Sequence, residues 1–399
     1  MPQLLTRALA AALLALTLVA CGKPTPERLL ADGRAALQNN DAKSAVVQLK
    51  SYVQAEPASA EGRLCAASWE QRYAGDTVPA PPVRAEQIPA HIGHNRTKAT
   101  STQEALGRLL TQLADIPEVG KRIVTASPDV AVSTNLGGWI NKLGVFASRA
   151  APVYDEGPKL LRWEPKPSGQ HIELGISEMN LFMWLSMFGL SHELSGQLLF
   201  PIGTVYDPFV CRGLDAFIYG VYSKSKFIVA GTPSGISLAP EGGNHQSTIT
   251  PSIGMELPNV MYYEPTFAQD MEWILLEGLR QICDREHGIS TYLRLSTADV
   301  DQTLFQPSLD RFGQDELRRQ VLAGGYRIID ATLDAPETNP ADTVQIVSAG
   351  IMLPEAIAAA RQLHDEGVAA NVIALTSPQK VFDGWQKRQR QSMANGGKR

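Results

Sequence analysis

The sequence is poor in cysteine, and its few cysteines are scattered. The 399 residues include four of them: Cys21, Cys65, Cys211 and Cys283. Their spacing fits neither a disulfide framework nor a set of metal ligands. His91 and His94 stand in a proline-rich polar stretch, where they do not indicate a metal site. We therefore expect no metal ligands and a redox-neutral origin for the large domain.

The sequence also lacks an excess of basic residues. Its formal net charge is -5, which gives no reason to expect a nucleic-acid partner. The N-terminal apolar run, ALAAALLALTLVA at residues 8–20, is too short to span a bilayer. Preceded by Arg7 and followed by Cys21, it resembles a bacterial lipoprotein signal whose lipobox is residues 18–21.

The lipobox predicts a signal peptide at 1–20 and a lipid on Cys21, which would tether the mature chain to a membrane. The residue directly after the lipidated cysteine is Gly22 and not an aspartate. In a Gram-negative cell this resembles the signal that sorts lipoproteins to the outer membrane, where the chain would lie on the periplasmic face. The alternative is a buried cysteine at the end of a helix.

Residues 21–67 predict a short all-α hairpin. Two amphipathic patterns flank Asn39, and Glu27 and Leu30 recur as Glu61 and Leu64 at the tetratricopeptide period. The stretch resembles the first repeat of a lipoprotein of exopolysaccharide and protein-sorting systems. One repeat cannot bury a continuous core, so we expect an incomplete module. Residues 68–100, rich in proline and polar side chains, predict a linker.

From residue 101 onward strands and helices alternate. The predicted strands are 123–126, 198–204, 226–231, 260–263 and 291–295, and the predicted helices start at Thr102, Glu178, Pro208 and Phe267. This alternation predicts an α/β fold with a doubly wound, mostly parallel sheet over 101–310. A strand, helix and strand after Thr343 predict a parallel crossover in a second, truncated α/β domain at 311–391, before a disordered tail at 392–399.

Two groups of polar residues stand out in this region. Glu178 directly precedes the apolar helix MNLFMWLSMFG, where it either stabilises the helix dipole in water or lies buried with a specific partner. Glu241 and His245 share the Gly-rich turn PEGGNHQS, which is either a proton-transfer site or a solvated loop. Together these groups predict a pocket at the carboxyl ends of the strands.

Several motifs in this order carry a family resemblance. They are SPDVAVSTNLGGWINKLGVF at 127–146, ELGISEMN at 173–180, YDPFVCRGLDA at 206–216, TPSGISLAPEGGNHQS at 232–247 and YLRLST at 292–297. From about residue 68 to 391 the chain resembles the second half of the homodimeric pyruvate dehydrogenase first component. That enzyme depends on thiamine diphosphate and belongs to the transketolase superfamily.

The resemblance implies roles for the site residues. Glu178 matches the glutamate that hydrogen-bonds the aminopyrimidine ring of the cofactor. Glu241 and His245 match the pair that handles protons on substrate and intermediates. Tyr206 or Phe209 stands where a ring stacks on the pyrimidine, although either residue also suits a core position. Asp129 matches a polar contact to the exocyclic amine, with a turn-forming aspartate as the alternative.

One motif of that family is missing. The superfamily binds the cofactor's diphosphate and Mg²⁺ through a Gly-Asp-Gly sequence in another domain, and this chain has no Gly-Asp-Gly. We therefore predict a chimera that carries half a site and does not decarboxylate 2-oxo acids alone. Its partners would be a second copy or a separate diphosphate-binding chain, and a lipoyl-bearing acyltransferase if it is active. Alternatives are a subunit like the beta chain of heterotetrameric relatives, or a membrane-tethered protein without catalysis.

Overall fold

The computed structural model describes residues 25–39, 44, 48, 51–52, 83–93, 98–149, 163–235, 242–334 and 339–394. The chain divides into two compact units, residues 1–79 and 80–399. In the first unit, helix α2 (Pro26–Gln38) follows the predicted amphipathic pattern, and its Leu29 and Leu30 pack with Tyr52. The signal peptide, the lipobox and Cys21 lie outside the described residues. Within the described segments, no helix has both the length and the apolar character that crossing a membrane requires.

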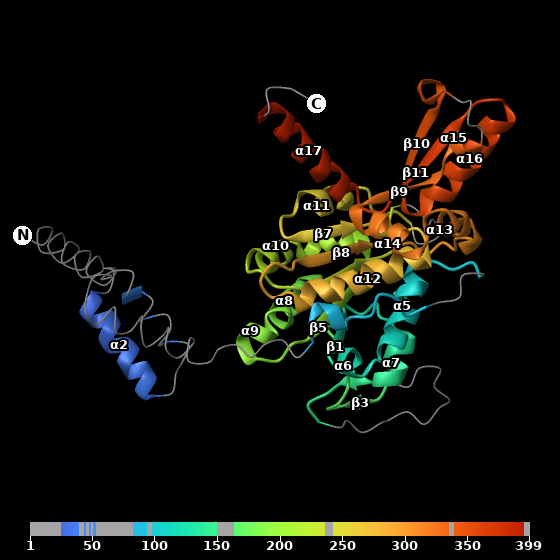
Figure 1. Cartoon of the computed structure of the whole chain (residues 1–399). Helices are drawn as coiled ribbons and strands as arrows, with labels where there is room; N and C mark the ends of the chain where they lie inside the picture. The colour runs from blue at the N-terminus through green and yellow to red at the C-terminus, as the bar shows by residue number, and fades with distance from the viewer. Residues whose placement is uncertain are drawn as a thin grey trace, which may run out of the picture. The chain divides into compact units, whose positions relative to one another are not determined.

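The second unit is built on an eight-stranded sheet in which all neighbouring strands are parallel (Figure 1). The strand order is β3-β2-β4-β1-β5-β6-β8-β7. The strands are β1 (Ile123–Ser127), β2 (Val145–Phe146), β3 (Pro165–Lys166), β4 (His171–Glu173), β5 (Phe200–Val205), β6 (Ile228–Gly231), β7 (Val260–Tyr263) and β8 (Ser290–Arg294). The predicted doubly wound α/β fold is therefore confirmed.

Helices cover both faces of this sheet. The helices of residues 101–283 are α5 (Thr102–Leu113), α6 (Pro117–Gly120), α7 (Gly137–Leu143), α8 (Glu178–Gly189), α9 (Ser191–Ser195), α10 (Leu214–Tyr222), α11 (Thr250–Glu256) and α12 (Ala268–Cys283). Trp139 of α7 and Trp273 of α12 belong to one hydrophobic core with Ile228 of β6. Phe182 of α8 belongs to a second core with Val229. Since neighbouring strand residues point to opposite faces, the two cores lie on opposite sides of the sheet.

The five predicted strands end within two residues of the observed ones, but the helix expected from Pro208 does not start there. Asp207–Gly213 forms a 3₁₀ segment, η2, and α10 begins at Leu214. Two close contacts explain the difference. The Asp207 side chain turns inward, and a Cβ on Gly213 would lie 2.3 Å from the Phe182 ring. The tight approach to α8 holds this stretch out of regular α-helix.

The predicted crossover after residue 343 is present. β10 (Val344–Ala349), α16 (Leu353–Asp365) and β11 (Ala370–Leu375) form it, and β10 pairs with β11 in parallel. β9 (Gly325–Ile329), which the sequence did not reveal, pairs with β11 antiparallel. The remaining helices of this part are α13 (Gln306–Phe312), α14 (Gln314–Ala323), α15 (Ala331–Asp334) and α17 (Pro378–Ala394). α17 includes residues 392–394 of the tail that was expected to be disordered.

Part of the predicted linker belongs to the second unit and packs into its core. Val83 and Ile88 are buried in its main core. Arg280 of α12 donates hydrogen bonds from Nη2 to the carbonyl oxygens of Ile88 and Pro89, at 2.9 and 2.7 Å. Buried apolar residues, which the proline-rich composition concealed, hold this stretch in place.

Candidate active site

The candidate residues follow the carboxyl ends of neighbouring parallel strands. The loop after β1 carries Asp129, the segment after β5 carries Tyr206 and Phe209, and the loop that ends at α11 carries His245. Glu178 begins α8, which follows β4. Carboxyl ends of parallel strands open at one edge of a sheet, where ligands of such folds bind.

Glu178 is buried, with 7% of its surface exposed. Ser177 caps α8, because its hydroxyl accepts the backbone N–H of Asn180 at 3.3 Å. Glu178 is therefore not needed as a solvent-exposed cap. Its Oε1 instead accepts a hydrogen bond from Nη1 of Arg212 at 3.2 Å. Of the two interpretations of this acid, the structure supports a buried carboxyl group with a specific partner.

Tyr206, Phe209 and His245 form an aromatic cluster. The His245 ring meets Tyr206 edge to face, with centroids 4.8 Å apart, and its centroid lies 5.6 Å from that of Phe209. Tyr206 donates its hydroxyl to Oγ of Ser133 at 2.8 Å, which ties the cluster to the loop after β1. The structure thus brings His245 against two aromatic residues from a distant part of the sequence.

Arg212 joins Glu178 to this cluster, and the sequence analysis did not identify it. Its guanidinium carbon lies 3.7 Å from the centre of the Phe209 ring, a cation–π contact. The same guanidinium donates to Glu178. A planar cation therefore lies between a buried carboxylate and an aromatic ring. The Arg212 side chain is 55% exposed, so solvent reaches this contact.

The remaining predicted residues contribute less to this group of contacts. Asp129 is exposed and has a φ of 63°, in the left-handed region that aspartate tolerates in turns. This conformation fits the turn-forming alternative. Glu241 lies outside the described residues, so its predicted pairing with His245 stays a prediction.

Asp207, the residue after Tyr206, belongs to a second polar cluster and is fully buried. Its Oδ1 accepts the hydroxyl of Tyr292 at 2.6 Å. Its Oδ2 accepts the hydroxyl of Thr250 at 2.6 Å and Nε of Arg294 at 3.0 Å. Three donors from β8 and α11 thus converge on one buried carboxylate.

Arg294 carries the cluster further. Its Nη1 donates to Oε1 of Glu264 at 2.5 Å, and its Nη2 lies 3.5 Å from the carbonyl oxygen of Ser247. The hydroxyl of Tyr262 also donates to Glu264. Burial lowers the pKa of Arg294, but the carboxylates of Asp207 and Glu264 outweigh it and raise that pKa above its ordinary value. The two carboxylates thus favour the charged form of the guanidinium.

A signal for this cluster was present in the sequence. Arg294 interrupts the apolar strand YLRL, and a charge inside a buried strand requires a buried partner. Asp207 follows the apolar strand FPIGTV at the edge where ligands bind. The sequence shows each charge separately, but it does not show that they meet.

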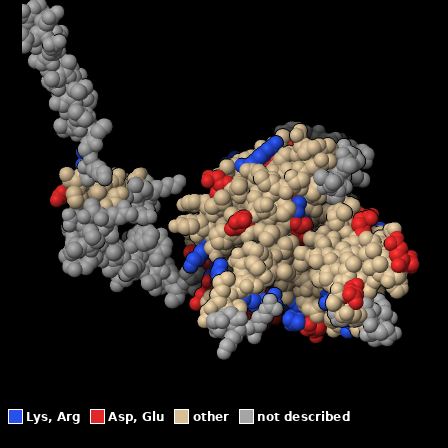
Figure 2. Space-filling view, turned by 90° about the horizontal axis from the view of Figure 1, so that it is seen from above, with Lys and Arg blue, Asp and Glu red and all other residues tan. Residues whose placement is uncertain are grey.

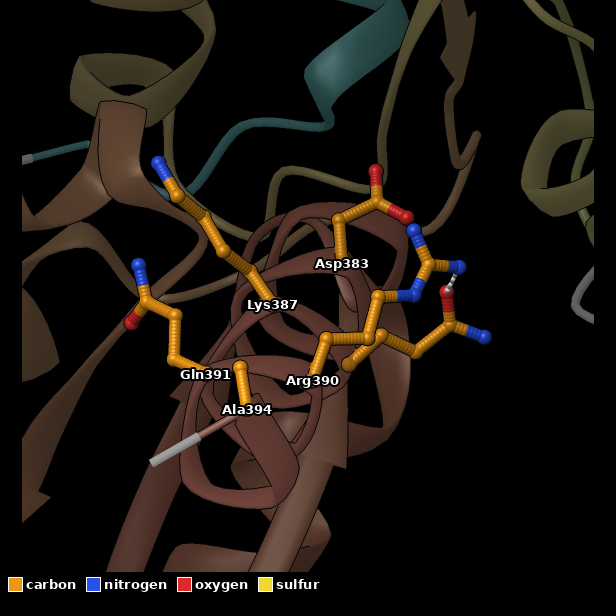
Figure 3. Close-up of a pocket in the computed structure, with 6 residues that line it drawn as sticks. Asp383, Lys387, Arg390, Gln391 and Ala394 are labelled. Carbon is orange, nitrogen blue, oxygen red and sulfur yellow. Dashed lines mark hydrogen bonds between the residues drawn. The ribbon is translucent and has the colours of Figure 1, made fainter. Parts of the chain in front are cut away.

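Two hollows lie on the surface away from Glu178 and His245. One, of about 460 Å³, lies along α5 and is lined by Glu104, Arg108 and Val132 among others. The other, of about 500 Å³, is lined by α17 alone, with Asp383, Lys387 and Arg390 along its wall (Figure 3). A surface formed by one helix encloses no ligand, so this second hollow is not a candidate site.

Charge and metal ligands add no further site among the described residues. On the face that Figure 2 shows, basic and acidic side chains lie scattered between larger areas of other residues. In the described part of the chain, no three or more His, Cys, Asp or Glu side chains are grouped so that they could hold a metal ion.

The chain is similar in sequence to several pyruvate dehydrogenase E1 components. It is 26% identical over 313 residues to the one from Pseudomonas aeruginosa, a match that covers 77% of this chain and 34% of that protein. It is also 26% identical over 302 residues to the one from Mycobacterium tuberculosis, covering 74% and 31%. The chain thus spans about a third of the length of these curated relatives.

Solved structures show the same fold at lower identity. The transketolase from Campylobacter jejuni superposes with a TM-score of 0.56 at 15% identity, over 86% of this chain and 44% of that one. The transketolase from Leishmania mexicana gives 0.56 at 20% identity, over 88% and 44%. These similarities support the fold and carry no conclusion about activity.

Residues 80–301 match the family described as the pyruvate dehydrogenase E1 component middle domain. The match covers the linker segment that packs on α12, the parallel sheet, and the residues of the pocket. It extends over more than half of the 399 residues. The chain therefore belongs to the pyruvate dehydrogenase E1 component middle domain family.

Proposed function

We propose that the pocket around Glu178 binds the aminopyrimidine ring of thiamine diphosphate, as the pyrimidine-binding part of a 2-oxo acid dehydrogenase. One observation carries this proposal. A buried carboxylate and an aromatic ring, Glu178 and Phe209, together hold the planar, hydrogen-bonding guanidinium of Arg212. Family membership of residues 80–301 supports the same function.

The pocket residues fit the chemistry of an aminopyrimidine. The guanidinium of Arg212 is flat, donates N–H groups to Glu178 and stacks on Phe209. An aminopyrimidine is also flat and, when protonated on a ring nitrogen, offers the same kind of donor to a carboxylate. Since the Arg212 side chain is more than half exposed, it can move aside for such a ring.

Thiamine diphosphate, when bound, supplies an acidic ring carbon that adds to the carbonyl group of a 2-oxo acid. This chain's residues would manage protons around it. Glu178 would hold a proton at a pyrimidine nitrogen, which a carboxyl group shielded from water can lend and recover. His245 would move a proton on the substrate side, with Glu241 as its partner. Tyr206 and Phe209 would orient the pyrimidine by stacking.

The diphosphate and its Mg²⁺ require oxygen ligands from outside these 399 residues in this proposal, because the sequence contains no Gly-Asp-Gly. An exposed apolar face supports a partner chain as their source. Met179, Met183 and Met187 form an exposed stripe along α8, the helix that Glu178 begins. Exposed Tyr219 and Tyr222 lie on α10, which packs beside α8. An apolar area of this kind is typical of a protein interface.

A separate diphosphate-binding chain is the partner that we favour. A second copy of this chain, the alternative, could cover the exposed apolar face but would lack the same Gly-Asp-Gly sequence. With that partner the pocket would decarboxylate a 2-oxo acid and pass the acyl group to a lipoyl-bearing acyltransferase. Without it we expect no turnover.

The lipobox at residues 18–21 supports a proposal about location. We propose that a lipid on Cys21 attaches the mature chain to the outer membrane, facing the periplasm. Equal amounts of wild type and Cys21→Ser in the membrane fraction of a Gram-negative host would contradict it.

Ligand titration tests the proposed function. We would titrate residues 80–399 with thiamine and with thiamine diphosphate plus Mg²⁺, and follow binding by saturation-transfer NMR. We expect both ligands to bind with similar, weak affinity through the pyrimidine. Glu178→Gln should weaken binding about tenfold or more, because a hydrogen bond to a charged group contributes about 1.5–3 kcal/mol.

The matched control is Glu316→Gln, which removes an acid paired with Arg319 on the surface of α14. It should leave the affinity unchanged. Equal binding by wild type and Glu178→Gln, or no binding by the wild type, would refute the proposed function. Much tighter binding of the diphosphate form would instead show that this chain holds the diphosphate itself.

A further inference from the structure

Arg294 is a deeply buried arginine close to the candidate site, and the proposed function gives it no role. Its side chain is 4% exposed, and that of its partner Asp207 is 0% exposed. Burying two charges costs several kcal/mol per ion, and well-packed apolar residues often stabilise a fold equally well. The cost of burying this pair therefore suggests that it has a role other than stability, such as holding nearby segments in place.

Asp207 anchors the segment that carries the aromatic residues. It follows Tyr206 directly and begins η2, which contains Phe209. A Cβ on Gly231, at the end of β6, would lie 2.3 Å from Oδ1 of Asp207. The carboxylate therefore lies against the end of the sheet, where only a glycine leaves it room.

The same pair anchors the segment that follows His245. Thr250, the first residue of α11, donates to Asp207 at 2.6 Å. The Ser247 and Thr250 hydroxyls are hydrogen-bonded to each other, and Nη2 of Arg294 lies 3.5 Å from the Ser247 carbonyl oxygen. Ser247, where the first of these contacts is made, thus lies only two positions after His245.

Arg294 connects these anchors to a third element. Its Nη1 donates to Glu264, whose backbone N–H donates to the carbonyl oxygen of Thr376 at 2.8 Å. The planar guanidinium directs several donors at fixed angles. Lysine would keep the charge but could not maintain both carboxylate contacts in this geometry.

We propose that Asp207 and Arg294 are a buried positioning pair that holds His245 against Tyr206 and Phe209. Neither residue lies in the described pocket, so the pair acts through the segments it joins. The significance for catalysis rests on the proposed function, because His245 handles protons only if the pocket takes the cofactor. The positional claim itself does not depend on any ligand.

NMR of the ligand-free protein tests this claim. In residues 80–399 labelled with ¹³C-histidine, the His245 ring signals are assigned with a His245→Asn variant. Ring currents of Tyr206 and Phe209 displace these signals from random-coil positions. We expect Arg294→Lys and Asp207→Asn to move them most of the way to random-coil positions while the other histidine signals stay in place.

The control is Arg285→Lys. Arg285 is also a mostly buried arginine, 12% exposed, and it pairs with Glu193 and the carbonyl oxygen of Gly189 away from the pocket. We expect this variant to leave the His245 signals unchanged. Unchanged His245 signals in both Arg294→Lys and Asp207→Asn would overturn the proposal, as would an equal displacement in Arg285→Lys.

The other histidines report folding. If Arg294→Lys moves every histidine signal, the variant has unfolded, and Asp207→Asn, which keeps the shape of the side chain, decides the outcome. Failure of thiamine to bind would contradict the proposed function and leave the positioning pair intact. If the wild type binds thiamine but the His245 signals stay in place in both variants, the positioning pair is contradicted and the proposed function is not.

Discussion

Two arginines meet buried carboxylates at the same edge of the sheet, but their surroundings differ. Arg212 reaches Glu178 from a side chain that is 55% exposed, and it rests on the face of Phe209. Arg294 lies between Asp207 and Glu264 with 4% of its side chain exposed. Solvent competes for the first pair and not for the second. The first contact can be exchanged for a ligand, whereas the second belongs to the permanent framework.

The largest predicted effect comes from breaking the buried pair. Arg294→Met leaves Asp207 fully buried and Glu264 partly buried without their cation. We therefore expect the free energy of unfolding to fall by about 3–5 kcal/mol. Urea unfolding of residues 80–399, followed by circular dichroism, measures it. Arg212→Gln should lower it by less than about 1 kcal/mol, because an exposed ion pair contributes little. Equal losses in the two variants would remove the distinction between the pairs.

A second effect, smaller over any one pH unit, concerns Asp270, a buried acid held without a strong ion pair. It is fully buried at the start of α12, where it accepts the backbone N–H groups of Thr266 and Phe267. Burial raises the pKa of Asp270 to about 7. Between about pH 4, the ordinary value for an aspartate, and pH 7, the native state therefore binds more protons than the unfolded state.

Stability from this group is complete below about pH 4 and falls as the pH rises to 7, by at most about 1.4 kcal/mol per pH unit. Asp270→Asn should remove that part of the decline. Urea unfolding of both proteins at several pH values checks it, and parallel stability curves would show that Asp270 titrates normally.

The sequence predicted the framework better than the contacts. The five strands were found because apolar runs such as KFIVAG end at turn residues. The start of α8 was found because Glu178 precedes a mostly apolar run. The strands β2, β3 and β4 span two or three residues each, too few to show a pattern. The stretch after Asp207 was predicted as a helix, because the inward turn of that side chain is set by Arg294, which lies 87 positions later.

The residues of the candidate site also divide into those that the sequence indicated and those that it did not. Glu178 and His245 were recognisable because each is chemically unusual where it stands. Arg212 was not, since an arginine in a polar segment is ordinary until the fold places it over Phe209. Pairing of distant charges depends on which strands become neighbours, and no local pattern encodes this.

The most direct test of the central claim is where thiamine binds. We would measure intermolecular NOEs between the C2-methyl protons of its pyrimidine ring and the protein, with Tyr206→Leu and Phe209→Leu variants to assign the aromatic signals. The account predicts NOEs from that methyl group to the ring protons of Tyr206 or Phe209, together with a displacement of the Arg212 side-chain N–H signals. NOEs confined to the hollow along α5, with Arg212 unaffected, would contradict it.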